Sequence, residues 1–132
     1  MARFGRRECA RDERGVAVVD FVLVLVVLLP LVLGIVHVAL VLHVRATLTS
    51  AASQGARYAA TIDRGPEAGA QRSRERIRGA LADRFAREVV AREISRGGVP
   101  VVEVEVIAEV PPLGLWGPAT RVRVSGHALA QP

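Results

Sequence analysis

The most prominent pattern in the chain is an apolar run from Val16 to Leu42, in which Asp20 and His37 are the only ionisable residues. As a helix this run would extend roughly 40 Å, which exceeds the roughly 30 Å thickness of a bilayer hydrocarbon core. The pattern therefore predicts one membrane-spanning helix over residues 16–42. Pro30 removes a backbone hydrogen bond within it and favours a kink, and Gly34 leaves a small notch one turn later.

The segment from His43 to Thr61 is rich in alanine and other small residues, with larger apolar residues at helical spacings. We expect the membrane helix to continue over residues 43–62, and its small residues suit the close approach of another helix. The sequence "DRGPEAG" at residues 63–69 then breaks the helix. A second, amphipathic helix is predicted from Pro66 to the Gly97-Gly98 pair. Its apolar face is formed by Ile77, Leu81, Phe85, Val89 and Ile94.

Two later segments alternate between apolar and charged residues, which is typical of half-buried strands. Val99–Val110 alternates valine with glutamate, and Thr120–Ala130 alternates valine with arginine. With the turn-rich connector Pro111–Pro118 they predict a two-stranded β-hairpin, in which glutamates of one strand face arginines of the other. A lone hairpin is marginal in water, so we expect the second helix to cover its apolar face. The predicted fold class is α+β, with a leader over 1–15, the membrane helix over 16–42, a helix extension over 43–62 and a small αβ domain over 63–132.

The distribution of charge predicts how the chain is oriented in a membrane. All 18 basic residues are arginine, and the formal net charge is +5. The twenty residues after the apolar run contain only Arg45 and Arg57, whereas five arginines precede it. Because basic residues next to a membrane span stay in the cytoplasm, we expect a cytoplasmic N-terminus and an extracytoplasmic C-terminal domain. The five are Arg3, Arg6, Arg7, Arg11 and Arg14.

The reactive residue types do not form a recognisable catalytic or metal-binding pattern. Cys9 is the only cysteine, so an internal disulfide is excluded, and we interpret it as an incidental thiol. His37, His43 and His127 are not spaced to converge on one metal ion. No Ser-His-Asp or paired-carboxylate arrangement stands out. We therefore expect no enzymatic activity, no metal and no cofactor.

The arginine-rich segment Gln71–Arg87 raises a separate hypothesis of nucleic-acid binding. Acidic residues interrupt it and aromatic residues are scarce, so we interpret it as a solvated helix face and expect no nucleic-acid partner. Salt-sensitive binding by the part of the chain from His43 onward would support the nucleic-acid hypothesis instead. A cleaved secretory signal peptide is a further alternative, but its apolar region usually holds only about 7–15 residues.

The position of Asp20 allows three interpretations. A carboxylate close to the headgroups is tolerated at the end of a membrane helix, because a charge costs about 2.5–3.5 kcal/mol only near the bilayer centre. A proton-relay or pore carboxylate would need a partner, and the span contains no second one. The third interpretation rests on spacing, since Asp20 is the fifth residue after Gly15, where the charged sequence ends.

That spacing resembles the cleavage signal of type IV prepilins and pseudopilins. In this family a basic leader ends in glycine, a membrane-embedded peptidase cuts after it, and the fifth residue of the mature chain is usually glutamate. The matching elements are the leader "MARFGRRECARDERG" with Gly15, then Val16, and Asp20 with Phe21. Cleavage would create an α-ammonium at Val16, and Asp20 could neutralise that of its own or a neighbouring chain.

The wider sequence resembles TadE-like proteins, which are minor pseudopilins of the tight-adherence (Tad) pilus. The family pattern of an acidic residue and phenylalanine before an apolar run with proline and Gly-Ile corresponds to Asp20-Phe21, Pro30 and Gly34-Ile35. The segment Ala51–Ile77 is similar to actinobacterial members, which carry a Gly-Ala-Arg-Tyr-Ala run before an Asp-Arg-x-Pro break. Here that run begins with Gly55, Ala56, Arg57 and Tyr58. The connector "PLGLWGP" between two valine-rich strands also fits.

The resemblance implies a non-enzymatic minor pseudopilin with a long pilin-like helix, processed after Gly15, in a Tad-type pilus or a related secretion filament. The implied partners are the lipid bilayer, the prepilin peptidase, other Tad minor pseudopilins, the major pilin and the inner-membrane assembly platform. The implied location is the inner or cytoplasmic membrane, with incorporation into an extracellular pilus as a further outcome. The alternative is a membrane-tethered binding module with an unprocessed anchor, for which a bulky residue at Gly15 would have no consequence.

Overall fold

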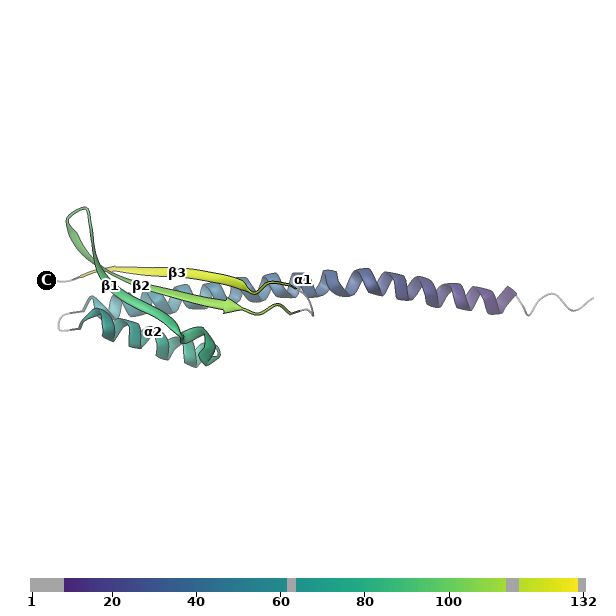
Figure 1. The fold of residues 1–132 in the computed structure, drawn as a ribbon, viewed down its shortest axis with the longest axis horizontal. Helices are drawn as coiled ribbons and strands as arrows, with labels where there is room; N and C mark the ends of the chain where they lie inside the picture. Colours follow the sequence, from purple (N-terminus) through teal and green to yellow (C-terminus); the bar gives the residue numbers. More distant parts are fainter. Residues whose placement is uncertain (1–8, 62–63, 114–116, 131–132) are drawn as a thin grey trace, which may run out of the picture. The chain divides into compact units, whose positions relative to one another are not determined.

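The computed structural model describes residues 9–61, 64–113 and 117–130, with the backbone alone for residues 9–12. Most of the basic leader (residues 1–8), Asp63 of the predicted helix break and part of the connector (residues 114–116) lie outside the described residues. The chain divides into two compact units, a first unit at Met1–Val36 and a second unit at His37–Pro132. The elements in chain order are α1 (Cys9–Ala59), α2 (Pro66–Ala80), the short 3-10 helix η1 (Asp83–Ala86), β1 (Glu88–Arg96), β2 (Val99–Val110) and β3 (Thr120–Leu129) (Figure 1).

The first unit consists of one helical segment with an apolar surface. Every side chain from Glu13 to Val36 is exposed, including the whole apolar run up to that point. The helix is long and apolar enough to cross a membrane, and none of its most apolar window is buried within the protein. A helix that is apolar on all sides needs an apolar environment such as lipid or other helices. The long N-terminal helix expected from the sequence is confirmed.

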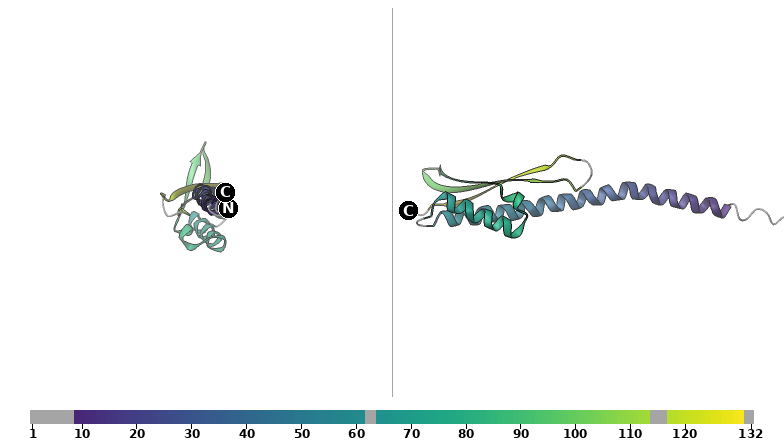
Figure 2. Two further views of the ribbon diagram at one scale, coloured as in Figure 1. Left: turned by 90° about the vertical axis from the view of Figure 1, so that its right-hand side faces the viewer. Right: turned by 60° about the horizontal axis from the view of Figure 1, so that its bottom comes forward.

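The second unit is a two-layer arrangement of helices on a sheet. Its three strands are antiparallel in the order β1-β2-β3, and α1 and α2 lie on one face of the sheet (Figure 2). The α+β fold class is thus confirmed. The alternating residues of β2 point toward the helices and are buried, as the sequence pattern predicted. The largest side chains that are fully buried are Val44, Leu48, Ile77, Val102, Val104, Val106 and Val110.

The opposite face of the sheet carries opposite charges on neighbouring strands. In the register of β2 with β3, Glu109 pairs with Arg121, and Glu103 pairs with His127. Arg121 lies 2.9 Å from the carboxylate of Glu109, and Arg123 lies 3.1 Å from that of Glu105. This confirms the prediction that the glutamates of one strand face the arginines of the other. Cross-strand pairs of this kind favour the observed register over a one-residue slip.

The predicted antiparallel pairing of the two later strands is confirmed, but the predicted extent of the second helix is wrong, and the sheet has three strands rather than two. The helix ends at Ala80 with Leu81 in an extended conformation, and residues 88–96 form a third strand, β1, which pairs with β2. Gly97 and Gly98 have φ angles of +64° and +82° and form the two-residue turn between β1 and β2. Such a turn needs positive φ at both central positions, which glycine adopts without strain.

The physical reason for this difference lies in what β1 supplies to the sheet. Without it, one edge of the buried strand β2 would leave its backbone groups unpaired, which costs free energy in a buried strand. Val89, Val90 and Ile94 are β-branched and suit a strand. Ile77, Leu81, Phe85 and Val89 all pack in the same core, but they come from different elements. Their four-residue spacing therefore resembles one face of a single helix without forming one.

Candidate functional site

The candidate processing residues lie together near the start of α1. The helix begins at Cys9, so Gly15 and Val16 are already within helical structure. Val16 and Asp20 are four residues apart, which puts them on the same face with about 6 Å between their Cα atoms. Helical side chains lean toward the N-terminus, so the side chain of Asp20 leans toward the turn that contains Val16.

Asp20 is an isolated charge on an otherwise apolar surface. Its side chain is exposed, and among the described residues it has no hydrogen bond or ion pair. Phe21 beside it is 66% exposed and Val16 is 61% exposed. A carboxylate in such surroundings is stable only near water or beside a positive group, because an unpaired charge is costly in an apolar medium.

The proposed kink and packing residues, Pro30 and Gly34, also lie in the first unit. α1 continues through Pro30 without a break in its helical structure. A Cβ atom at Gly34 would meet nothing within 4 Å, so this notch is unoccupied by any described part of the chain. At His37, the first residue of the second unit, Nδ1 is buried and has no hydrogen-bond partner among the described residues.

The helix-extension motif has a definite structural role in the second unit, because Gly55 forms the crossing point of α1 and α2. A Cβ atom there would collide with the side-chain oxygen of Ser73 and lie 2.6 Å from the carbonyl oxygen of Gly69. A Cβ atom added at Gly69 would in turn lie 2.6 Å from the carbonyl oxygen of Gly55. The buried hydroxyl of Ser73 donates a hydrogen bond to the carbonyl of Ala51 at 3.1 Å. Only residues without side chains allow the two backbones to approach this closely.

The same part of α1 also packs against the sheet. A Cβ atom at Gly126 in β3 would collide with the backbone of Ala52 and Ser53. Ala52 and Ala56 are fully buried at this interface. The small residues of α1 therefore pack against α2 on one side and against β3 on another. A larger residue at these positions would separate the layers.

The last two motif residues face outward. Arg57 is exposed, and Tyr58 is half-buried beneath two guanidinium groups. The guanidinium of Arg64 lies 4.0 Å from the centre of the Tyr58 ring, and that of Arg72 lies 5.8 Å away. These cation–π contacts connect the end of α1 to the segment before α2 through Arg64 and to α2 itself through Arg72. The motif thus combines close packing at its glycine with a surface contact at its tyrosine.

The outer face of the sheet holds a cross-strand group of charged side chains around Glu103. Glu103 accepts a hydrogen bond from Arg92 at 2.7 Å and lies 3.0 Å from His127 Nε2. The hydrogen bond from Arg92, followed by that from His127, holds the pKa of Glu103 below its usual value. This arrangement is a cross-strand ion-pair network that stabilises the register. No group of three or more His, Cys, Asp or Glu side chains in the described parts of the chain could hold a metal ion.

Three residues with a structural role at this site were not identified from the sequence. Gly69 and Ser73 occur four residues apart in α2, a spacing of small residues that indicates a helix contact but does not name its partner. Gly126 interrupts the valine alternation of β3, and a glycine inside a strand pattern is a signal for close backbone approach.

The comparisons with known proteins found a match to the part of the chain that forms α1. The family model described as TadE-like protein matches residues 15–57, which is less than half of the chain. The match begins at Gly15 and ends one residue before Tyr58, so it includes both the apolar run and most of the helix-extension motif. No curated protein and no solved structure matches the chain.

Proposed function

We propose that this chain, which matches the family model described as TadE-like protein over residues 15–57, is a non-enzymatic minor pseudopilin that helps to assemble a Tad-type pilus or a related secretion filament. The family match supports a Tad pilus-associated pseudopilin with an N-terminal membrane-type helix. The observation that carries the assembly role is the surface of the first unit, an exposed apolar helix with a single acid placed one turn after Val16. The actinobacterial type remains part of this proposal, based on the run from Gly55 to Tyr58.

The proposal includes cleavage between Gly15 and Val16 by a prepilin peptidase. Cleavage would leave an α-ammonium at a helix N-terminus, where the helix dipole already favours a negative group. The carboxylate of Asp20 can reach either this ammonium or that of a neighbouring copy, and such pairing is strongest where water is scarce. Pairing would allow the apolar helix to associate side by side with other pilin-like helices. The partners would be the major pilin, other minor pseudopilins and the inner-membrane platform.

In this proposal the part of the second unit that follows the span is extracytoplasmic, and the N-terminus is cytoplasmic. The arginine-rich leader supports the orientation, because basic residues flanking a span remain inside. The proposed domain organisation is the leader over 1–15, the span over 16–42, the extension over 43–62 and the αβ domain over 63–132. The close packing of α2 and β3 on the small residues of α1 would keep that domain fixed to the end of its own helix.

The N-terminal mass of the membrane form tests the processing step. The chain is expressed in cells with an active prepilin peptidase, and the mature form should begin at Val16. Gly15→Leu should abolish cleavage, whereas Gly34→Leu is a matched control, because a Cβ atom meets nothing within 4 Å at either glycine. Recovery of an intact leader from the wild-type chain would contradict processing.

The alternative is a membrane-tethered binding module with an unprocessed anchor. The observation in its favour is that α1 is helical on both sides of Gly15, and a helical peptide bond is less accessible to a peptidase than an extended one. Under this alternative Gly15→Leu would leave both the mass and the localisation of the chain unchanged.

A further inference from the structure

A basic cleft of about 320 Å³ opens in the second unit beside η1 and the ends of β2 and β3. Arg84, Arg87 and Arg121 contribute guanidinium groups to its lining, and Glu88 and Glu109 contribute carboxylates. The three positive groups exceed the two negative ones, so the lining favours an anion. None of these residues belongs to the assembly site proposed for α1.

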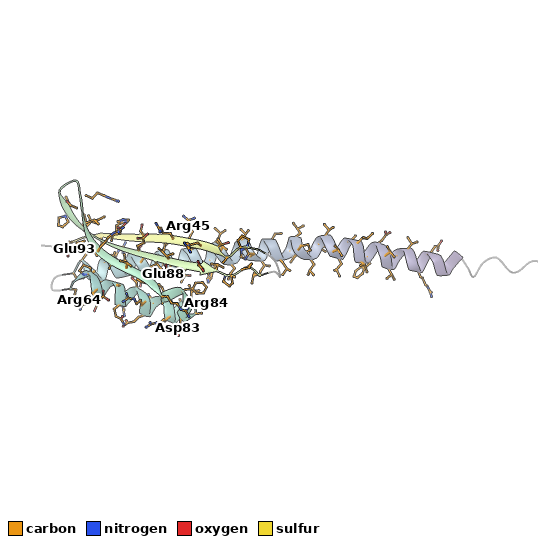
Figure 3. All side chains as sticks on the ribbon, viewed as in Figure 1. Arg45, Arg64, Asp83, Arg84, Glu88 and Glu93 are labelled. Carbon is orange, nitrogen blue, oxygen red and sulfur yellow. The ribbon has the colours of Figure 1, made fainter. Side chains whose placement is uncertain are left out.

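Two of these arginines are available to a ligand. Arg121 is already held by Glu109 through hydrogen bonds of 2.9 and 3.3 Å. Arg84 and Arg87 are exposed and form no ion pair with any described residue. Asp83, which Figure 3 labels beside Arg84, lies 3.7 Å from Arg78 instead. The Arg84 guanidinium also lies 5.0 Å from the centre of the Phe85 ring, a contact that leaves its N–H groups able to donate. Two guanidiniums that line one cleft match the oxygens of a phosphate group, which an arginine can bind in a bidentate way.

The contacts between β3 and α1 indicate which residues of α1 lie beside the cleft. Gly126 lies against Ala52, and Ala128 packs in the cluster of Ala59 and Ala60, so β3 and α1 advance in the same direction. The five residues from Gly126 back to Arg121 cover roughly 16 Å of strand. This length corresponds to about eleven residues of helix, counted back from Ala52. Arg121 therefore lies level with about Val41, next to the end of the apolar run at Leu42.

We propose that this cleft is a docking surface for the phosphate groups of anionic phospholipids, in the membrane leaflet from which the second unit emerges. An apolar run that ends beside Arg121 brings the lipid headgroup layer to the same level as Arg84 and Arg87. Arg45, exposed on α1 one turn beyond Val41 and labelled in Figure 3, adds positive charge to this part of the unit. Docking would restrain the tilt of the second unit at the membrane surface. The inference rests on the membrane placement of α1 in the proposed function.

The test uses the full chain, reconstituted in vesicles and spin-labelled at Ala82→Cys in a Cys9→Ala background. Ala82 is exposed and lies two residues from Arg84. The ratio of docked to free components in the spectrum is measured in pure phosphatidylcholine and in vesicles with about a third phosphatidylglycerol. Anionic lipid should raise the ratio. The double variant Arg84→Gln/Arg87→Gln should lower it roughly 10- to 30-fold in the anionic vesicles.

The control is Arg57→Gln/Arg96→Gln, which removes the same charge from exposed positions at the other end of the second unit. It should keep the wild-type ratio. A ratio that is equal in both lipids, or an equal loss in the control, overturns the proposal. The same rise in pure phosphatidylcholine on addition of inorganic phosphate overturns the lipid as ligand. A chain that fails to float with the vesicles overturns the membrane placement as well, whereas a floating chain without lipid dependence overturns the docking surface alone.

Discussion

Gly55→Ala tests the claim that α1 and α2 are held together by a backbone contact. The added Cβ atom would collide with the hydroxyl of Ser73 and lie 2.6 Å from the carbonyl oxygen of Gly69. An ordinary contact needs about 3.5 Å, so the helices must separate by most of an ångström at this point. Ser73 is fully buried and would lose its hydrogen bond to the carbonyl of Ala51.

The expected change in the free energy of unfolding combines three effects. Overpacking of this kind costs about 1–3 kcal/mol. The lost hydrogen bond of Ser73 adds about 0.5–1.5 kcal/mol. Alanine is a better helix former than glycine, which returns up to about 1 kcal/mol. The second unit should therefore be destabilised by about 0.5–4.5 kcal/mol in the variant, which corresponds to roughly 2- to 2,000-fold more frequent opening.

Hydrogen exchange of the β2 amides in the detergent-solubilised full chain measures this opening. The matched control is Gly79→Ala in α2, where a Cβ atom meets nothing within 4 Å. This control should stabilise the unit by about 0.5–1 kcal/mol, through helix propensity alone. If exchange in Gly55→Ala is as slow as in the wild type, or slowed as in Gly79→Ala, the close-contact reasoning is refuted.

Three further predictions concern the sheet and the first unit. Gly126→Ala should lower the urea midpoint by an amount that corresponds to about 1–3 kcal/mol, because its Cβ atom would meet the backbone of Ala52. The control Ser125→Ala, on the exposed face, should leave the midpoint unchanged. Equal midpoints in the two variants would contradict the close contact at Gly126. Glu103 has a lowered pKa in the folded state, so its contribution is present above the ordinary value of 4.5 and is lost as pH falls through the lower folded pKa. The urea midpoint of Glu103→Gln should accordingly fall less steeply than that of the wild type below about pH 4.5, and parallel pH profiles would contradict the coupling. Asp20→Ala should leave membrane insertion intact while impairing filament assembly, and Asp20→Glu should restore assembly; normal filaments from the alanine variant would exclude the pairing role.

The sequence predicted those parts of the fold in which the pattern of apolar and polar residues fits only one type of secondary structure. The run Val16–Leu42 could only be a long apolar helix, and the valine–glutamate alternation of Val99–Val110 could only be a half-buried strand. β1 was missed because apolar residues at every fourth position also fit a strand and a short 3-10 helix joined by a bend. The decision between these solutions came from the unpaired edge of β2, which is a tertiary effect.

The candidate site shows the same division between local and tertiary information. The spacing of Asp20 from Gly15 is a local property and could be read directly. The close approach at Gly55 was suggested by its small neighbours, but its partners Gly69 and Ser73 depend on how α2 crosses α1. Gly126 depends on which residue of β3 lies over α1, and alternation alone does not determine that register.

The segment that matches the TadE-like family model has an exposed part in the first unit and a packed part in the second unit, so substitutions in the two parts should act by different routes. Side chains of the first unit, such as Asp20, are exposed and have no tertiary contact to lose within the described chain, so a defect caused there arises in an interaction outside the chain. The small residues from Ala51 to Ala59 are occupied by α2 and β3 and are therefore not free to bind an outside helix. Exchange at β2 should thus rise in Gly55→Ala and stay unchanged in Asp20→Ala, even if both variants fail to assemble. One loss of filaments would then have two separable causes, an unfolded second unit in the first variant and, under the proposed processing, an unpaired ammonium in the second.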